Sequence, residues 1–373
     1  MNVNNYMNDK VSIPISVCMI THNHEKFIRQ AIDSILNQSF SHFELIIVND
    51  GSSDQTEDII RTYKDSRIRF YSQPNQGPST AFNQAIRLAT GTYVALMSGD
   101  DISHPERLAV QYGWLEKHGA RITFSQADFI DSSSSILINP TMDQLINQLQ
   151  LDTQAKVIHQ FFFNGNYLCA GTCMVLRELI LEKGLFNPAL IQLQDYDLWY
   201  KIALTTPLTV LPKKLLSYRI RSDQGNLSHA INQSRNIFEY VEVHRMMMAE
   251  IPMPVFRESF RECLVRPDFS DETGFAFEKA FLFLKHRLTL VQYIGLQNLY
   301  TLMQDDRMVK HAIEYYDFSL PSLYKLILEH KWLPEFYNTD LKQYIYTKLR
   351  TRRDRVIKKI LSPFRGFLGI DLA

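Results

Sequence analysis

The sequence predicts an α/β protein with a mostly parallel, doubly wound sheet and a mainly helical C-terminal extension. Two observations predict the sheet: short apolar runs alternate with amphipathic helical segments, and the turns between them are short and polar. A third observation predicts the extension, because helical periodicity dominates beyond about residue 235 and strand-like alternation is not evident there. The 373 residues are enough for both parts.

The first part of the chain repeats a buried strand, a polar turn and a helix. Continuous apolar runs rich in β-branched residues predict strands that are buried on both faces. The expected strands are 15–21, 43–48, 68–71 and 93–97. Apolar residues at helical spacing predict a helix at about 26–38, another through 59–60, and a third that ends near residue 90.

The next part of the chain continues the alternation less regularly. Proline near its start predicts a helix over 105–118. Further strands are expected at 122–130, 173–176 and 215–220, and further helical segments at 143–163 and 193–204. The chain therefore supplies strands on both sides of the acidic turn described next.

The strand at 93–97 stops abruptly at Ser98-Gly99-Asp100-Asp101. In an open α/β sheet the carboxyl edge of the strands is where ligands bind. Adjacent carboxylates repel one another, and Mg²⁺ or Mn²⁺ commonly bridges such oxygens to a substrate phosphate. The alternative is a solvated turn in which Asp101 caps the helix that follows Pro105. The turn alone does not decide between these interpretations.

Composition and charge exclude some classes of protein. Forty basic residues balance forty acidic ones, which disfavours a general nucleic-acid binder. Residues 1–12 are polar and lack the apolar core of a signal peptide, and no apolar stretch is long enough to span a membrane. The four cysteines show no disulfide framework. We therefore expect a cytoplasmic protein.

Five segments resemble family 2 glycosyltransferases, which have the GT-A fold, and they occur in the family's order between about residues 15 and 229. These segments are VCMITHN at 17–23, SILNQS at 34–39, ELIIVNDGSSD at 44–54, NQG at 75–77 with AFN at 81–83 and ATGTY at 89–93, and QDYDLW at 194–199. The resemblance implies an inverting enzyme that transfers a sugar from a nucleotide diphosphate, here expected to be UDP.

Several positions depart from the family's usual pattern. His22 stands where tyrosine is common, and Ser98 replaces the first acid of Asp-x-Asp-Asp. Gln194 replaces a glutamate, and Arg221 stands where a histidine often follows the Tyr-Arg pair. The four acids on which the implied activity depends are retained: Asp50, Asp100, Asp101 and Asp195.

The resemblance implies a role for each candidate residue that binds the donor. Asp50 would accept a hydrogen bond from the imide N–H of the base. Asp101, supported by Asp100, would hold the Mn²⁺ or Mg²⁺ ion that neutralises the leaving diphosphate. The remaining candidates for contacts to the nucleotide sugar are Thr21, Asn23, Ser52, Asp100 and Arg221. Turn formation is the alternative for Asp50, and an exposed surface position is the alternative for Arg221.

Asp195 is the candidate general base. Inverting transfer needs one carboxylate to take the proton of the acceptor hydroxyl as that hydroxyl attacks the anomeric carbon. The alternative is an N-cap aspartate for the helical segment that begins there. A glycan or a lipid-linked glycan is the expected acceptor, in the synthesis of a polysaccharide or glycolipid.

The resemblance also divides the chain. It implies a nucleotide-sugar-binding half over 13–118 and an acceptor-binding half over 119–234, with the polar segment 1–12 before them and the helical region 235–373 after them. Basic and apolar residues interleave at helical spacing over 350–368, which predicts either peripheral contact with an acidic membrane or packing on the protein itself. The aromatic residues of the helical region would suit a surface that forms a homo-oligomer, and the sequence does not decide the oligomeric state.

Two other functions are less well supported by the sequence. A nucleotidyltransferase usually has a glycine-rich phosphate loop after the first strand, but residues 21–25 contain no glycine. A sugar-nucleotide-binding scaffold without catalysis is supported only by Ser98 and Gln194, and both have the more important acid beside them. Retained nucleotide binding without turnover would favour the scaffold.

Overall fold

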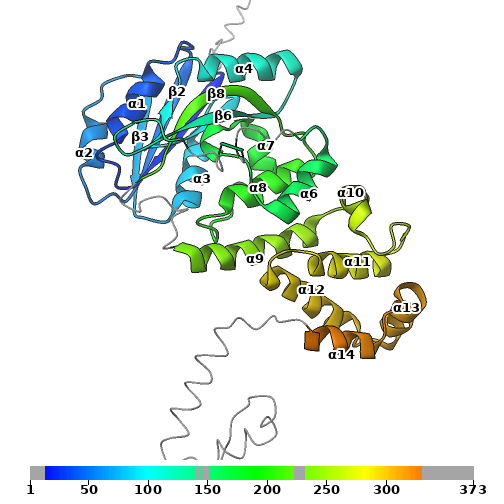
Figure 1. Ribbon diagram of the computed structural model, residues 1–373. Coiled ribbons are helices and arrows are strands. Elements are labelled where there is room, and N and C mark those ends of the chain that lie inside the picture. Colours follow the sequence, from blue (N-terminus) through cyan, green and yellow to red (C-terminus); the bar gives the residue numbers. More distant parts are fainter. Residues whose placement is uncertain (1–12, 139–142, 145, 147–150, 222–231, 330–373) are drawn as a thin grey trace, which may run out of the picture. The chain divides into compact units, whose positions relative to one another are not determined.

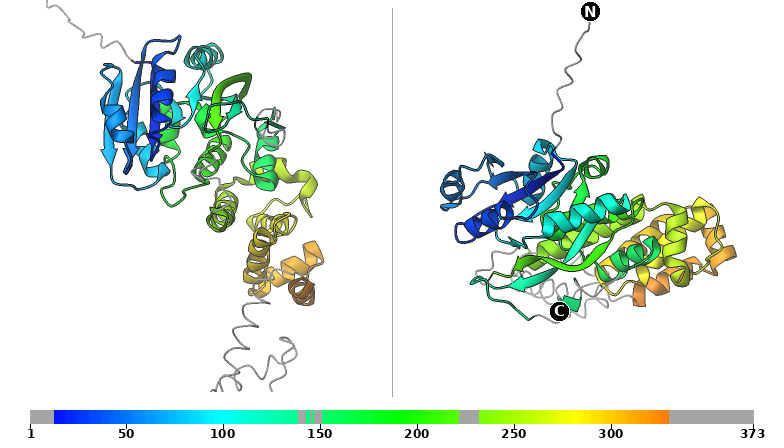
Figure 2. Two further views of the ribbon diagram at one scale, coloured as in Figure 1. Left: turned by 60° about the vertical axis from the view of Figure 1, so that its left-hand side comes forward. Right: turned by 90° about the horizontal axis from the view of Figure 1, so that it is seen from above.

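The computed structural model describes residues 13–138, 143–144, 146, 151–221 and 232–329 (Figures 1 and 2). The chain divides into two compact units, Met1–Glu262 and Cys263–Ala373. Helix α9 (Gln233–Glu250) and helix α10 (Met253–Phe260) belong to the first unit, whereas the sequence suggested that the helical region begins at about residue 235, within α9. The polar segment 1–12 and the basic segment 350–368 lie outside the described residues.

The first half of the sheet is parallel. Its four strands are neighbours in the order β3-β2-β1-β4, and each pair runs in the same direction. Ile15 is in register with Phe43 on one side and with Tyr93 on the other, so the strands end at a shared carboxyl edge. The strands are β1 (Ile15–Thr21), β2 (Phe43–Asp50), β3 (Ile68–Gln73) and β4 (Tyr93–Ser98).

The second half of the sheet is mixed. Strand β7 runs antiparallel to both β4 and β6, strand β6 runs parallel to β8, and β5 pairs antiparallel with β8. These strands are β5 (Ile102–Ser103), β6 (Ile122–Ile130), β7 (Met174–Leu176) and β8 (Val210–Arg219). The predicted α/β class is confirmed, with a sheet order of β3-β2-β1-β4-β7-β6-β8-β5.

Helices cover both faces of the parallel half. Alternate residues of β1, β2 and β4 share one hydrophobic cluster with apolar residues of α1 and α4. Helix α3 contacts β1 and β2 through side chains outside that cluster, as expected for the opposite face. Helices α6, α8 and α9 pack next to one another in the green part of Figures 1 and 2. The helices before α9 are α1 (Ile28–Leu36), α2 (Thr56–Arg61), α3 (Pro78–Leu88), α4 (Arg107–His118), α6 (Gln154–Asn164), α7 (Arg177–Glu182) and α8 (Gln194–Ala203).

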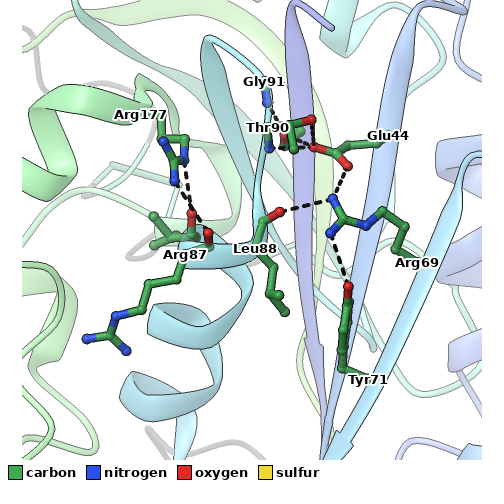
Figure 3. Close-up of polar contacts among 10 residues, drawn as sticks. Glu44, Arg69, Tyr71, Arg87, Leu88, Thr90, Gly91 and Arg177 are labelled. Carbon is green, nitrogen blue, oxygen red and sulfur yellow. Dashed lines mark hydrogen bonds and ion pairs between the residues drawn. The ribbon is translucent and has the colours of Figure 1, made fainter.

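A polar network lies at the amino-terminal edge of the parallel half of the sheet (Figure 3). One oxygen of the buried Glu44 carboxylate accepts hydrogen bonds from Ser16 Oγ at 2.6 Å and from Thr90 N and Oγ1 at 2.7 and 2.8 Å. The other oxygen accepts from Arg69 Nη1 at 2.6 Å. Burial raises the pKa of Glu44, but these hydrogen bonds outweigh it and hold the pKa below its usual value.

Two arginines satisfy the last carbonyls of α3 in the same network (Figure 3). Arg69 Nη1 donates to Leu88 O at 3.0 Å, and Arg177 donates to the carbonyls of residues 86 and 87 at 3.1 and 3.4 Å. The cations also complement the negative end of the helix dipole. Gly91 lies here because an added Cβ would be 2.5 Å from Ser16 N, a backbone contact that no other residue tolerates.

The second unit is helical in its described part, as the sequence predicts. Phe277, Ala280, Leu299 and Leu323 form its buried core. Gly295 allows close packing of α12 on α11, since an added Cβ would be 2.6 Å from Ala280 O. The helices are α11 (Glu272–Leu284), α12 (Thr289–Leu302), α13 (Asp306–Tyr316) and α14 (Leu320–Glu329). Among the described residues, no helix combines the length and apolar character needed to span a membrane.

Candidate functional site

The carboxyl edge of the parallel strands gathers the residues predicted to bind the donor. Thr21 ends β1, Asp50 ends β2, and Asp100 and Asp101 follow β4. Because β1 lies between β2 and β4, the three strand ends are adjacent. The site is therefore assembled by strand order, although its residues are up to 80 positions apart in the chain.

Asp50 organises the loop that leads into α3. Its Oδ1 accepts hydrogen bonds from Gln73 Nε2 at 2.7 Å and from Gln76 N at 2.9 Å. Its Oδ2 accepts from Gly77 N at 2.8 Å. Gly77 has φ of 87° and precedes Pro78 at the start of α3, so the carboxylate fixes the point where this helix begins.

The turns after β1 and β2 are tied together by their own polar groups. Asn23 N donates to Ser52 Oγ at 2.9 Å, and Asn23 Oδ1 accepts from Ser53 N at 2.8 Å. Asn23 has φ of 55°, a conformation that asparagine tolerates better than most residues. His22 Nδ1 contacts Asp50 O at 2.8 Å. Asn23 and Ser52 therefore share one rigid double turn beside Asp50.

Thr21, at the end of β1, and His24, in the turn that follows, face the acidic turn. Thr21 is buried, and its Oγ1 lies 3.2 Å from His24 Nδ1. An added Cβ at Gly99 would come within 2.7 Å of Thr21 Oγ1, so glycine allows the two turns to approach. His24 Nε2 lies 3.6 Å from Asp100 Oδ2. Burial lowers the pKa of His24 despite the nearby Asp100, which favours a neutral imidazole.

The two adjacent acids have different surroundings. Asp100 Oδ1 accepts a hydrogen bond from Ser98 Oγ, and its Oδ2 faces His24 and, at 4.0 Å, Arg221 Nη1. Asp101 is more deeply buried, and its Oδ1 accepts from Arg219 N at 2.9 Å. Burial, and then the charge of Asp100, raise the pKa of Asp101 well above its usual value.

Arg219 at the end of β8 holds the acidic turn in place. Its guanidinium is buried and donates to Asp100 O at 2.7 Å and to Asp131 O at 2.7 Å. A further N–H donates to Gln30 Oε1 at 2.8 Å, and the group lies 4.7 Å from the centroid of the Phe27 ring. Arg221 lies over the same ring at 5.3 Å. The two arginines therefore place positive charge beside both acids.

Asp195 lies in the first turn of α8. Its Oδ1 accepts from Tyr196 N at 2.8 Å, and its Oδ2 accepts from Asn166 Nδ2 at 3.0 Å. Burial raises the pKa of Asp195 to about 6, although both hydrogen bonds act in the opposite direction. A carboxylate with this pKa is a stronger base than an exposed aspartate and is still mostly ionised at neutral pH.

Cys169 lies close to both groups of acids. Burial, and to a smaller extent the charges of Asp101 and Asp195 in that order, raise the pKa of its thiol to about 12. An added Cβ at Gly171 would be 3.2 Å from Asp101 Oδ2 and 4.0 Å from Cys169 Sγ. The Cys169 segment therefore lies beside Asp101 and within electrostatic range of Asp195.

Helix α3 connects the donor side to the segment that precedes Asp195. Asn83 exchanges two hydrogen bonds with the backbone of Phe186, at 2.8 and 2.9 Å. Ser79 Oγ donates to Leu190 O at 2.5 Å. Because α3 begins at the loop held by Asp50, this helix contacts both that loop and the segment 186–190 that precedes Asp195.

Comparison with known proteins assigns a family to this arrangement. The model of glycosyl transferase family 2 matches residues 16–185. An uncharacterized glycosyltransferase of Methanocaldococcus jannaschii is 32% identical over 237 residues, which cover 62% of this chain and 79% of that protein. The chain belongs to glycosyl transferase family 2. The O-antigen biosynthesis glycosyltransferase WbnJ of Escherichia coli is 30% identical over 218 residues, which cover 56% of this chain and 80% of that protein.

Solved structures support the GT-A fold of this family 2 chain. S. aureus TarS 1–349 in complex with UDP-GlcNAc superposes with a TM-score of 0.53 at 19% identity, covering 80% of this chain and 83% of that one. The mannosyltransferase PcManGT of Pyrobaculum calidifontis, in complex with GDP-Man and Mn²⁺, gives 0.50 at 17% identity, covering 84% and 78%. The predicted GT-A fold with a helical C-terminal region is confirmed.

Three residues around the candidate site were not predicted from the sequence. Arg219 was visible only as part of the Tyr-Arg pair, and its burial depends on residues far away in the chain. His24 was not among the candidate residues, but its imidazole lies 3.6 Å from the Asp100 carboxylate. Asn166 lies in a segment with no recognisable pattern, so no signal in the sequence connects it with Asp195.

Proposed function

We propose that this family 2 chain transfers a sugar, with inversion, from a nucleotide diphosphate to a hydroxyl of a glycan or lipid-linked glycan. One observation carries the proposal. Asp195, whose pKa burial raises to about 6, and Asp101 of the acidic turn both lie within electrostatic range of Cys169. This supports a base of suitable strength near acids suited to a nucleotide and a diphosphate.

The donor would bind across the ends of β1, β2 and β4. Asp50 accepts three hydrogen bonds within the protein, and a carboxylate has about four acceptor positions. One position is therefore left for the imide N–H of a base. Asn23 and Ser52 lie in the double turn beside it, near enough for contacts to base or ribose. Thr21 is more buried, and its contact with His24 would stabilise this turn from the protein interior.

Asp100 fits a divalent ion better than Asp101 does. Mg²⁺ and Mn²⁺ are often held by one or two carboxylates together with substrate phosphates and water. Asp100 Oδ2 faces His24 and Arg221, whereas the more buried Asp101 accepts a hydrogen bond from Arg219 N. No set of three ligating side chains surrounds an ion position in the described part of the chain, so the diphosphate would supply further ligands. When bound, the ion neutralises charge on the leaving diphosphate.

Asp195 would act on the acceptor. As the acceptor oxygen bonds to the anomeric carbon, the bond from that carbon to the diphosphate breaks, and the hydroxyl proton moves to Asp195. Asn166 and Tyr196 N orient the carboxylate for this transfer. Arg221 adds a fixed positive charge near Asp100, where negative charge grows on the departing group.

The finer assignments rest on relatives. The name of the E. coli relative supports a role in cell-envelope polysaccharide synthesis, and the TarS complex supports a UDP-linked donor whose sugar is a hexosyl or an N-acetylhexosaminyl group. The complex of the mannosyltransferase supports Mn²⁺. We place the donor within 13–118 and the acceptor within 119–234. We also propose a cytoplasmic enzyme whose segment 350–368 contacts the inner face of the membrane, with self-association through 235–373.

The decisive experiment measures nucleoside diphosphate release from a panel of nucleotide sugars, with Mn²⁺, Mg²⁺ or a chelator. Metal-dependent release from one donor is expected, because slow hydrolysis proceeds without an acceptor. Asp100→Ala should abolish the metal dependence and most of the release. The matched variant Asp101→Asn should chiefly lower stability, because it changes the carboxylate that accepts from Arg219 N.

Two other outcomes would contradict the proposal in different ways. UDP binding by calorimetry without release, with every acceptor tried, would favour the non-catalytic scaffold. Neither release nor nucleotide binding would refute the glycosyltransferase assignment of this site. Release that is unchanged by Asp100→Ala would mean that the ion does not bind at the acidic turn.

A further inference from the structure

We infer that Glu239, on helix α9, is a positioning residue for Asp195. The inference rests on the proposed function of Asp195 as the base and adds a residue outside the part of the chain that the family model matches. Helix α9 packs beside α8, as Figures 1 and 2 show. Glu239 would act through the backbone that leads into α8, without touching the reacting atoms.

The contacts of Glu239 are confined to one short segment of backbone. Its Oε1 accepts a hydrogen bond from Ile191 N at 3.0 Å. Its Oε2 accepts from Gln192 N at 2.8 Å and from Leu193 N at 2.9 Å. Leu193 is the N-cap of α8, and its own side chain has no oxygen to cap the helix. Glu239 therefore supplies, from another helix, an acceptor that this helix start lacks.

Burial makes this anchor rigid. Glu239 is 2% exposed, so its charge depends on the donors that surround it. Three consecutive N–H groups and the positive end of the α8 dipole meet that need. Arg235, one turn earlier on α9, donates from Nε to Gln192 Oε1 at 3.1 Å and fixes the side chain of the same segment. A carboxylate in this environment allows little movement of residues 191–193.

The anchored segment ends two residues before Asp195. The opposite side of the segment is fixed by α3, through Ser79 Oγ to Leu190 O and through Asn83 to Phe186. Asp195 is thus carried by a helix whose entry is held from two directions. Since a general base works only within hydrogen-bond reach of the proton it takes, a displacement of about 1 Å costs about a hundredfold in rate.

A merely structural glutamate would behave differently from a positioning one. A structural role predicts lower stability with an unchanged turnover number for the molecules that remain folded. A positioning role predicts a lower turnover number with donor affinity retained, because the donor residues lie on β1, β2 and β4. The two roles are therefore separable by measurement.

The test compares Glu239→Gln with Glu242→Gln, a matched change at a half-exposed position of the same helix. Glu242 forms an ion pair with the nearby Arg245 at 3.4 Å. We expect Glu239→Gln to lower kcat for transfer about 10- to 100-fold, because the amide replaces one acceptor oxygen with a donor that faces backbone N–H groups. The dissociation constant for UDP should stay within about twofold of wild type in both variants. Glu239→Asp, which keeps the charge, should recover part of the loss.

Hydrogen exchange gives a readout that does not depend on activity. The amides of residues 191–193 should exchange faster in Glu239→Gln and remain protected in Glu242→Gln. If Glu239→Gln does not fold, Arg235→Gln loosens the same segment more mildly and should lower kcat in the same direction.

The outcomes separate the two proposals. A wild type that releases no nucleoside diphosphate refutes the proposed function, and with it the role of Asp195. An active wild type whose Glu239→Gln variant keeps kcat within about twofold, or keeps the three amides protected, refutes positioning by Glu239 alone.

Discussion

The amino-terminal edge of the parallel half of the sheet and the start of α8 hold acids in different electrostatic environments. At the amino-terminal edge, Glu44 accepts hydrogen bonds from Ser16, Thr90 and Arg69, and its pKa lies below its usual value. At the start of α8, the pKa of the half-buried Asp195 is raised to about 6. Both carboxylates are at least partly removed from water, so the difference lies in the donors and cations that surround them.

This difference fits a stabilising role for Glu44 and the role as a base that is proposed for Asp195. A fully hydrogen-bonded carboxylate beside a cation favours its ionised form and binds a proton poorly. The Asp195 carboxylate has few hydrogen bonds to offset its desolvation, so it holds a proton more readily, as a general base must. The first arrangement stabilises the sheet, and the second would keep a reactive group at some cost in stability.

The largest expected effect is the loss of transfer in Asp195→Asn. The amide cannot take the hydroxyl proton, so kcat should fall about 10²- to 10⁴-fold. The folded-state pKa of Asp195 is raised above the usual 3.8, so this group favours the folded state at low pH, and that contribution is lost as pH rises through 6. The variant should therefore unfold in urea within about 1 kcal/mol of wild type at pH 7.

Asp197→Asn is the matched control for that prediction. Asp197 lies in the same turn of α8 but pairs with Lys201 at 2.9 Å. Its replacement should reduce stability and leave kcat within a few fold. Equal loss of kcat in both variants would mean that the start of α8, and not the base, had been disturbed.

The second effect is on stability and concerns Glu44, at the amino-terminal edge of the parallel strands. Glu44→Gln removes one acceptor oxygen from the network around Arg69 and should lower the free energy of unfolding by about 2 kcal/mol. The pKa of Glu44 is lowered in the folded state, so its contribution is present above the unfolded value of 4.5 and is lost as pH falls below it. The difference between wild type and variant in urea denaturation should shrink below that pH.

Activity per folded molecule should be unchanged in Glu44→Gln, because the candidate site lies at the other end of the strands. A large loss of kcat with little change in stability would contradict the division of roles between the two edges.

A third effect concerns the pH dependence of transfer. The base works when deprotonated, so kcat should fall on the acid side with an apparent pKa near 6 in the wild type. Gln194→Glu would place a second carboxylate beside Asp195, where the Gln194 oxygen is buried without a hydrogen-bond partner. Like charge disfavours ionisation, so the acid limb should move to higher pH. A limb that moves to lower pH, or does not move, would contradict Asp195 as the titrating base.

The smallest expected effect is that of Asn166→Ala. Asn166 Nδ2 donates to Asp195 Oδ2 and lowers its pKa, so removing it should raise the pKa and move the acid limb slightly upward. A pH–rate profile at saturating donor measures this shift. Asn164→Ala, which removes an exposed amide two residues earlier, is the control and should leave the limb in place.

The fold class and most of the elements near the site could be predicted from the sequence. Continuous apolar runs identified the strands because buried parallel strands need apolar residues on both faces. The strand at 122–130 was predicted with the limits that the structure has, and the acidic turn was correctly placed after β4. The start and end of helix α1 differ by about two residues from expectation, since helix ends depend on local caps.

The environment of each acid depends on how the elements pack. Asp100 and Asp101 are adjacent aspartates in the sequence, and their different surroundings come from Arg219, more than a hundred positions later. Glycine is required at position 91 by the close approach of β1, which the sequence does not show. The pKa of Asp195 and its support from Asn166 and Glu239 depend on burial and on contacts between distant segments. Local sequence patterns do not encode such contacts, because they form only when the elements pack.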